Sequence, residues 1–368
     1  MPESFHPCGV IPKKARVAVF DTPNGAFRLA DYPLRLPEPD EVLVRVRMST
    51  ICRSDIHSWQ GHRPSPCPGL LGHQIVGTIA ALGARVTRDL RDYPLAVGDR
   101  ITWSEYFVPG RNVMRDIHDL PQKSPGVDKY GHMSADEPPH HHGGFAEFCY
   151  ILPDSWILRL PDILSDEEAT PINCGVATMC AVIEAADIRF GDTVVIQGLG
   201  LLGLYGAAMA KARGASYVIG IDGVAGRREL AMRFGVDKAL DAGDPDAIAP
   251  LCKSGIADVV IEVCGRPAVI PDGMAMLRTG GRYVLAGVVN PSAMVTLDAN
   301  QILKKYLTLK GVHNYHPRHL LQAMEFVLAN RERFPLRSLV DGKYPLTEVG
   351  QAMADAANHR VLRAAIVP

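Results

Sequence analysis

Residues 193–203 combine an apolar strand, a glycine-rich turn and the start of an apolar helix. Gly198, Gly200 and Gly203 have the spacing G-x-G-x-x-G. The first glycine permits a tight turn, the second lets the backbone approach a pyrophosphate, and the third lets helix and strand pack closely. The helix start adds backbone N–H donors and the positive end of the helix dipole. This segment therefore predicts a βαβ unit that binds a dinucleotide.

A carboxylate follows the glycine loop at the sequence spacing that dinucleotide-binding loops require. Asp222 ends the apolar run 217–221, about 20 residues beyond the loop. An acid there accepts hydrogen bonds from the adenosine ribose 2′-hydroxyl and repels a 2′-phosphate, which favours NAD over NADP. Arg227 and Arg228 are the counter-argument, since arginine pairs with a 2′-phosphate. A glycine turn that binds nothing is the alternative interpretation.

Strands and helices alternate on both sides of the glycine loop. We expect helices at 177–186, 201–213, 227–234 and 317–330, and strands at 193–196, 217–221, 257–263 and 281–286. Apolar strands that alternate with helices indicate an α/β fold with a doubly wound parallel sheet, because helices cover both of its faces.

The first half of the chain is instead predicted to be rich in β-structure. Residues 15–20 and 41–48 alternate with a period of two and are joined by the proline-rich stretch 33–39. Residues 72–83 have small side chains followed by a strand pattern. The stretch 103–144 has no such pattern, and long loops of this kind are more often functional or interfacial than idle.

Bulk composition excludes several classes of function. A chain of 368 residues fits about two domains, and 47% apolar with 21% charged residues is ordinary for a soluble protein. A net charge of −1 gives no reason to expect a nucleic-acid or membrane-surface partner. Residues 1–14 lack the apolar core of a signal peptide, and no apolar run approaches a membrane span. We therefore expect a cytoplasmic protein.

Two cysteines and one histidine have neighbours that suggest metal binding. None of the eight cysteines forms a C-x-x-C pair, so reduced thiols are expected. Cys52, His73 and Cys174 offer two thiolates and one imidazole to a single zinc ion. Three protein ligands leave a fourth position open, which distinguishes a catalytic zinc from a structural one. A buried, non-ligating thiol is the alternative for Cys174.

Motifs along nearly the whole chain resemble the zinc-containing alcohol dehydrogenases of the medium-chain dehydrogenase/reductase superfamily. They are Glu41–Val46, Ile51–His57, Gly72-His73, Gly98–Arg100, Gly143–Glu147, Cys174–Thr178, the glycine loop and Lys310-Gly311. The resemblance implies a GroES-like β-rich catalytic domain at 1–175 and 315–368, and a Rossmann NAD-binding domain at 176–314. It also implies one catalytic zinc on Cys52, His73 and Cys174, and hydride transfer between a small alcohol and NAD.

The resemblance implies roles for the residues that follow Cys52. Asp55 would orient a zinc ligand, although it could simply cap a turn. Ser54 and His57 would pass the alcohol proton to solvent, and imidazole titrates in the useful range. A surface histidine is the alternative for His57. Trp59 would form a wall of the substrate pocket, with plain core packing as the rival interpretation.

Cofactor contacts are implied on both domains. Arg53 and Arg363 match positions that contact the cofactor pyrophosphate, which suits the two-pronged guanidinium. Further candidate cofactor-binding residues are Arg227 and Val288, with Leu201 and Leu202 of the glycine loop.

The chain departs from the family pattern in two places. Gln74 stands where the family has a glutamate beside the metal, suggested to assist ligand exchange, so we expect less negative surroundings for the zinc. Residues 103–144 contain no cysteine, which excludes a structural zinc on four cysteines. The triplet 140–142 of three histidines could bind metal or form an exposed or subunit-contacting loop. Short similarities at 120–123 and 129–132 to a phosphonate-associated subgroup suggest a hydroxyphosphonate as substrate.

Three rival interpretations stay open. A zinc-free quinone or enoyl reductase would lack the Cys/His/Cys set. A polyol dehydrogenase would use a glutamate as third ligand, for which Glu147 and Glu184 are available. A nucleotide-binding relative without turnover would bind no zinc. Family relatives join their coenzyme-domain sheets, so we expect a homodimer, with a tetramer as the alternative, formed through a strand near 281–295.

Overall fold

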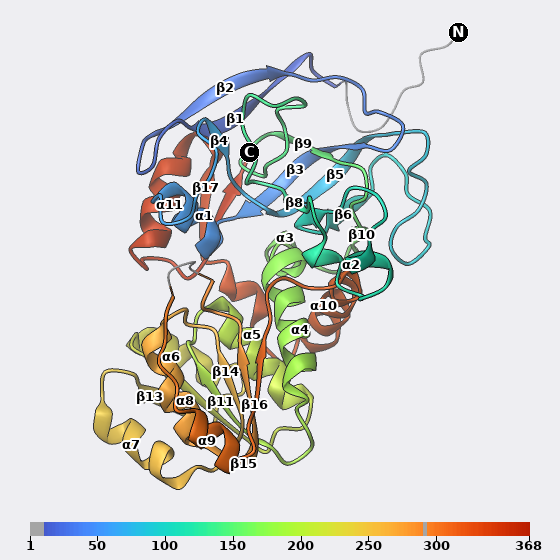
Figure 1. Cartoon of the computed structure of the whole chain (residues 1–368). Coiled ribbons are helices and arrows are strands. Elements are labelled where there is room, and N and C mark those ends of the chain that lie inside the picture. Colours follow the sequence, from blue (N-terminus) through green and yellow to red (C-terminus); the bar gives the residue numbers. More distant parts are fainter. Residues whose placement is uncertain (1–10, 290–292) are drawn as a thin grey trace. The chain divides into compact units, whose positions relative to one another are not determined.

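A computed structural model describes residues 11–289 and 293–368 of the chain. Outside these ranges lie residues 1–10, which include Cys8, and residues 290–292, which belong to the segment 281–295 expected to hold a strand. The chain divides into two compact units (Figure 1). Unit 1 contains Met1–Cys174, His316–Leu328 and Leu336–Pro368; unit 2 contains Gly175–Tyr315 and Ala329–Pro335.

Unit 2 is built on a six-stranded sheet in which all neighbouring strands are parallel. The strands are β11 (Thr193–Gln197), β12 (Tyr217–Asp222), β13 (Lys238–Asp241), β14 (Ala257–Glu262), β15 (Leu277–Leu285) and β16 (Thr308–Gly311). Their order is β13-β12-β11-β14-β15-β16, so the chain reverses direction across the sheet between β11 and β14. The predicted doubly wound parallel sheet is confirmed, and the reversal is where such folds bind dinucleotides.

Helices connect these strands (Figure 1). They are α4 (Ala177–Ala186), α5 (Leu201–Ala212), α6 (Ala225–Met232), α7 (Pro245–Ser254), α8 (Ile270–Met276) and α9 (Ala299–Lys304), with the short turn η3 (Pro267–Val269). α4 packs on α5 and α7 packs on α8. The sequence predicted α4, α5 and α6 but not α7, which contains Pro250, or α8, which contains Gly273.

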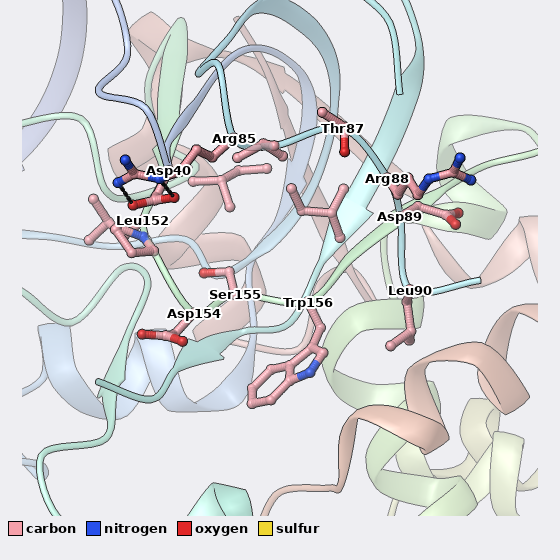
Figure 2. A pocket seen from close by; sticks show the side chains of 14 residues that line it. Asp40, Arg85, Thr87, Arg88, Asp89, Leu90, Leu152, Asp154, Ser155 and Trp156 are labelled. Carbon is pink, nitrogen blue, oxygen red and sulfur yellow. Dashed lines mark hydrogen bonds and ion pairs between the residues drawn. The ribbon is translucent and has the colours of Figure 1, made fainter. Parts of the chain in front are cut away.

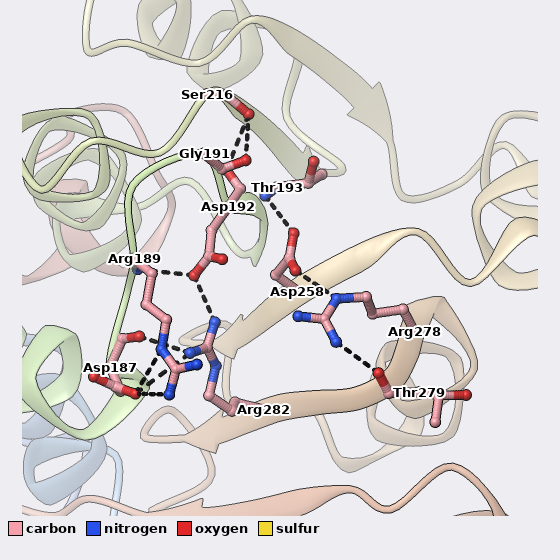
Figure 3. A network of polar contacts seen from close by, with 10 residues as sticks. All are labelled: Asp187, Arg189, Gly191, Asp192, Thr193, Ser216, Asp258, Arg278, Thr279 and Arg282. Atoms are coloured by element: carbon pink, nitrogen blue, oxygen red, sulfur yellow. Dashed lines mark hydrogen bonds and ion pairs between the residues drawn. The ribbon is translucent and has the colours of Figure 1, made fainter.

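Ion pairs and hydrogen bonds connect residues near the starts of β11 and β14 with β15 (Figure 3). The Asp192 carboxylate accepts from Arg282 at 2.5 Å, and Asp258 accepts from the backbone N–H of Thr193 at 2.8 Å. Arg278 donates to Asp258 at 2.5 Å. These contacts fix β11, β14 and β15 relative to one another, so the loop after β11 emerges from a braced sheet.

Unit 1 is rich in β-structure, as expected. Its main sheet follows the order β10-β6-β5-β3-β18-β17, with β9 also on β3; β2-β1-β4 and β7-β8 form smaller sheets. The strands are β1 (Lys14–Phe20), β2 (Phe27–Pro33), β3 (Val42–Thr50), β4 (Gly69–Leu70), β5 (Gln74–Leu82), β6 (Arg100–Trp103), β7 (Tyr106–Phe107), β8 (Asp128–Lys129), β9 (Phe148–Ile151), β10 (Ile157–Arg159), β17 (Gly342–Pro345) and β18 (Ala364–Val367). The apolar core includes Val44, Ile79 and Trp103.

Helices in unit 1 are short apart from those near its C-terminal segments. They are α1 (Arg53–Trp59), α2 (Val113–Asp116), α3 (Asp166–Ala169), α10 (Pro317–Asn330, whose last two residues belong to unit 2) and α11 (Val349–Ala357), with the turns η1 (Pro121–Lys123), η4 (Leu336–Leu339) and η5 (Leu346–Glu348). A π-helical turn, η2 (Ile172–Val176), precedes α4. The stretch Asp166–Ala186 has the length and composition of a membrane span, but 78% of its most apolar window is buried, as in a core helix.

The strand expected to join two subunits is not an edge of the sheet. β15 is hydrogen-bonded to β14 on one side and to β16 on the other. The prediction for 281–295 was therefore wrong for its described strand residues, because an interior strand has no backbone groups left for a second copy. Within the described ranges, β16 is the edge at this end of the sheet.

Candidate metal centre

His73 is placed by a glycine that no other residue could replace without strain. Gly72 has φ +88°, and a Cβ added to it would lie 2.7 Å from the Phe145 ring. His73 follows directly before β5, and its side chain is only 2% exposed. The backbone turn that leads into His73 therefore requires glycine at position 72.

Asp55 connects the two segments that carry Cys52 and His73. Cys52 is the N-cap of α1, and its backbone N–H donates to Asp55 at 2.7 Å. The other carboxylate oxygen accepts from the backbone N–H of Gly72 at 3.1 Å and lies 3.2 Å from Nδ1 of His73. Asp55 therefore caps helix α1 and orients the His73 imidazole at the same time. The two roles expected for it, a turn cap and a partner of a zinc ligand, are compatible.

Cys174 completes a compact set of soft donors. It lies on the π-helical turn η2, a conformation often found at functional sites. The sulfur atoms of Cys52 and Cys174 and a ring nitrogen of His73 lie within 4.8 Å of one another. Cys174 Sγ is 3.5 Å from His73 Nε2, close to the separation of about 3.6 Å expected for sulfur and nitrogen ligands on one tetrahedral zinc. These residues fit a zinc ion.

Asn173, beside Cys174, fixes the spacing of this set. Its side-chain amide donates to the backbone oxygen of His73 at 2.9 Å and to that of Trp103 at 2.9 Å. Asn173 is fully buried. One amide group therefore ties together the three segments that carry Cys174, His73 and the end of β6.

Electrostatics favour a deprotonated Cys52, whereas Cys52 and burial raise the pKa of Cys174 well above its ordinary value. The hydrogen bond from Cys174, together with His73, holds the pKa of Cys52 well below its ordinary value despite burial. Burial lowers the pKa of His73, but Asp55 and Cys52 outweigh it and raise that pKa to about 10. A thiolate is the form in which cysteine binds metal, so Cys52 is prepared as a ligand.

Glu105 is a member of this neighbourhood that the sequence did not reveal. It lies just after β6, is 3% exposed, and its carboxylate is 3.8 Å from Nε2 of His73. Gln74, in contrast, is fully buried and its side-chain oxygen accepts from Thr50 at 2.6 Å. The expectation that Gln74 makes the surroundings of the zinc less negative stays a prediction. Glu105 supplies a carboxylate here from a loop that carries no recognisable pattern.

Ser54 and His57 both lie on α1, next to Cys52. The Ser54 hydroxyl is 3.5 Å from Nε2 of His73, the nitrogen that belongs to the donor set. His57 is half-buried, and burial together with Arg53 lowers its pKa below the usual value. Trp59 donates to the backbone oxygen of Gly25 at 2.9 Å and packs against an apolar cluster, so packing is an established part of its role.

The two arginines expected at the cofactor pyrophosphate differ in their surroundings. Arg53 is exposed on α1. Arg363 is 8% exposed and donates to the backbone oxygen of Ile51 at 2.5 Å. Its positive charge also contributes to the low pKa of Cys52. Both arginines are therefore adjacent to the segment that carries Cys52.

The glycine loop in unit 2 has the geometry that its spacing predicts. A Cβ added to Gly203 would lie 1.8 Å from the backbone oxygen of Gly198, whereas space around Gly200, the N-cap of α5, is open. The Asp222 carboxylate accepts from the backbone N–H of Leu199 at 2.8 Å, and Arg227 lies 3.9 Å from it. The acid thus braces the loop. The remaining candidates here are Leu201, which is buried, with Leu202 and Val288, which are partly buried.

The alternative ligands lie elsewhere. Glu147 accepts from Arg16 at 2.7 Å, and Glu184 is exposed on α4. Neither belongs to a cluster of potential ligands among the described residues. A second such cluster consists of Asp55, His73 and His132, but the Asp55 carboxylate is already engaged by His73 and two backbone N–H groups.

The histidine triplet is neither exposed nor arranged around a common point. His141 and His142 are fully buried. Ring nitrogens of His140, His141 and His142 lie 2.9, 3.4 and 3.0 Å from backbone oxygens of three different residues. The expectation of an exposed loop was wrong, because these rings satisfy carbonyl groups inside unit 1.

A surface pocket of unit 1 is lined by residues that do not belong to the donor cluster (Figure 2). It has a volume of about 580 Å³ and lies between residues 85–90 and 151–157. The Asp40–Arg85 ion pair borders it, with Nε to Oδ1 at 2.7 Å. None of its lining residues is a candidate metal or cofactor ligand.

Comparisons with known proteins agree with this geometry. Residues 38–162 match the model of the alcohol dehydrogenase GroES-like domain, and residues 202–329 that of the zinc-binding dehydrogenase domain. A probable alcohol dehydrogenase of Mycobacterium tuberculosis is 34% identical over 91% of this chain and 89% of its own length. The 5-exo-hydroxycamphor dehydrogenase of Pseudomonas putida is 27% identical over 92% and 94%.

Solved structures give the same result. An alcohol dehydrogenase from Thermotoga maritima superposes with a TM-score of 0.90 at 26% identity, covering 96% of this chain and 99% of that one. Two matched domain models, a relative above 30% identity and the shared fold all agree. The chain therefore belongs to the zinc-containing alcohol dehydrogenases of the medium-chain dehydrogenase/reductase superfamily.

Proposed function

We propose that this protein is a zinc- and NAD-dependent alcohol dehydrogenase with one zinc per chain, held by Cys52, His73 and Cys174. The observation that carries the proposal is the set of three donors within 4.8 Å, with His73 held by Asp55. Three ligands leave one position for substrate. When bound, zinc acts as a Lewis acid on the substrate oxygen, and the nicotinamide ring accepts or gives the hydride.

Ser54 and His57 are proposed to carry the alcohol proton away. The Ser54 hydroxyl lies 3.5 Å from the His73 nitrogen of the donor set, so it is within reach of an alcohol oxygen beside that set. His57 is three residues further along α1 and half-buried, with a pKa lowered by burial. A neutral imidazole accepts a proton from the hydroxyl side and releases it to solvent.

NAD is the proposed cofactor. The glycine loop would hold the pyrophosphate. Arg53 and Arg363 are also proposed to contact it, because a guanidinium suits phosphate oxygens. Asp222 carries a negative charge at the end of β12, which favours a ribose hydroxyl over a phosphate. Arg227 lies 3.9 Å from that carboxylate and is partly neutralised by it. Comparing kcat/KM for NAD and NADP tests this choice, and a preference for NADP would overturn it.

The proposed substrate is a secondary or alicyclic alcohol, or a hydroxyphosphonate. The hydroxycamphor dehydrogenase among the relatives supports the first class. A specific observation favours the second: the Arg63 guanidinium lies 3.5 Å from Nε2 of His132, whose ring stacks on His73 at 5.3 Å between centroids. A cation this close to the donor set suits an anionic alcohol.

The decisive experiment combines metal analysis with a substrate panel. About one zinc per chain, with NAD reduction on alcohols or hydroxyphosphonates, is expected. A protein that binds nucleotide but retains no zinc would instead be a relative without turnover. Secondary alcohols, polyols and hydroxyphosphonates, compared at equal concentration, separate the substrate classes.

We also propose a cytoplasmic homodimer. The exposed edge strand β16 is preceded by Leu303 and Tyr306, which are 77% and 84% exposed. Large apolar side chains beside an unpaired strand edge suit a contact with a second copy. Sedimentation should give about twice the 40.0 kDa chain mass, and a monomer at micromolar concentration would contradict the proposal.

A further inference from the structure

The backbone around Glu105 is fixed from two sides. Asn173 holds the Trp103 oxygen at the end of β6, two residues before Glu105. The backbone oxygen of Glu105 accepts from the N–H of Tyr130 at 3.1 Å, next to the paired strands β7 and β8. Glu105 is therefore held against the donor set by the same amide that fixes His73.

The two oxygens of the Glu105 carboxylate have different neighbours. Oε1 lies 3.4 Å from Nζ of Lys129, and Oε2 lies 3.8 Å from Nε2 of His73. A nitrogen ligand and an oxygen ligand on the same tetrahedral zinc are about 3.3 Å apart. The distance from Oε2 to His73 therefore exceeds the separation of two such ligands by only about half an ångström.

The Glu105 carboxylate is not within 4.8 Å of all three donors, so it stands beside the fourth position and not in it.

We propose that Glu105 is a fourth, exchangeable protein ligand, which occupies the open zinc position when substrate is absent and returns to Lys129 when substrate binds. This inference rests on the zinc site of the proposed function. A purely structural ion pair would need only Lys129. It would not require Oε2 to face His73, nor the carboxylate to be buried at 3% exposure.

The test uses full-length protein in which cobalt(II) replaces zinc, because its visible spectrum reports the ligands directly. In substrate-free protein, Glu105→Gln should change the cobalt spectrum, since water takes the place of a carboxylate. With saturating NAD and alcohol, variant and parent spectra should coincide, because the substrate then holds that position. A chelator should remove metal from the substrate-free variant about 10–100-fold faster.

Two further variants make the result specific. Glu105→Asp keeps the charge beside Lys129 but withdraws the oxygens by one methylene, so it should behave like Glu105→Gln if the oxygen binds metal. Glu147→Gln removes a carboxylate that pairs with Arg16 outside the site, and should leave spectrum and chelation rate unchanged. A thermal melt confirms that each variant is folded.

The opposing outcomes are distinct. Substrate-free spectra that superimpose for parent and Glu105→Gln would overturn the inference, as would a Glu105→Asp protein identical to the parent. A difference that persists in the presence of NAD and alcohol would refute exchange. A parent protein that takes up neither cobalt nor zinc would overturn the proposed function itself, and the inference with it.

Discussion

The Asp55 carboxylate lies 3.2 Å from Nδ1 of His73, and both side chains are almost completely buried. This contact fixes the ring so that Nε2 faces the two sulfur atoms. Asp55→Asn should lower zinc affinity about 10–100-fold, the usual effect of losing such a partner. Competition with a chromophoric chelator measures it. Asp89→Asn is the control, because Asp89 is equally buried but binds Arg91 and backbone groups away from the donors.

Two glycines separate cofactor binding from helix stability. Gly203→Ala should weaken NAD binding and cost about 1–3 kcal/mol in the free energy of unfolding, because its Cβ would meet the Gly198 oxygen at 1.8 Å. Gly226→Ala, in open space on α6, should be neutral or stabilise by up to about 1 kcal/mol. Denaturant unfolding and NAD titration measure both. Equal NAD affinity in the two variants would contradict the assigned loop.

The proton route predicts a defined dependence on pH. Burial and Arg53 lower the pKa of His57, so its neutral form accepts a proton above that pKa, and alcohol oxidation should slow as pH falls through it, below 6.5. His57→Gln should lower kcat about 100-fold and remove this limb of the profile. His62→Gln is the control: it removes a nearby positive charge and should shift the limb slightly upward. An unchanged profile in His57→Gln would exclude the relay.

Cofactor choice should depend on the charge of Asp222. Asp222→Asn should raise the ratio of kcat/KM for NADP over NAD roughly 10–100-fold, since a charged hydrogen bond is worth about 1.5–3 kcal/mol. Asp241→Asn, which weakens the contact with Arg228 at 2.8 Å and the hydrogen bond from the Gly243 N–H, should change the ratio far less. Similar NADP-to-NAD ratios in both variants would show that other residues discriminate between the two cofactors.

Acid stability should depend on Glu167. Burial raises its pKa, but Lys343 outweighs burial and brings the pKa to about 2. Because the folded pKa lies below the unfolded one, this stabilisation is present above about pH 4.5 and lost as pH falls toward 2. Glu167→Gln should remove roughly 1–3 kcal/mol at pH 7, reduced by the half-exposed lysine. The free energy of unfolding, measured with urea, should therefore differ less between pH 7 and pH 3 in the variant than in the parent protein.

The sequence predicted those parts of the site that depend on local chemistry. Examples are the glycine spacing, Asp222 and the group Cys52–Asp55. At each of these positions the local geometry calls for a particular residue type, so a short segment of sequence is enough to identify it. The strands and helices around them were predicted for the same reason, since β11, α5 and α4 have uniform apolar patterns.

The remaining features depend on packing between distant segments. Glu105 reaches His73 only because Asn173 joins two segments that lie 70 and 100 residues away from it. His141 and His142 are buried because carbonyl groups from other segments meet their rings. The sequence did not delimit β2, because most of its side chains are exposed and give no apolar pattern. No pattern within any single segment contains this information.

β3 ends at Thr50, two residues before Cys52, and pairs there with β18, where Ala365 faces Thr50. During synthesis, all three donors leave the ribosome long before β18 exists. The nascent chain thus carries the proposed zinc donors while their supporting sheet is incomplete and the whole of unit 2 is still being made. Stable zinc binding is therefore expected only once β18 has been added.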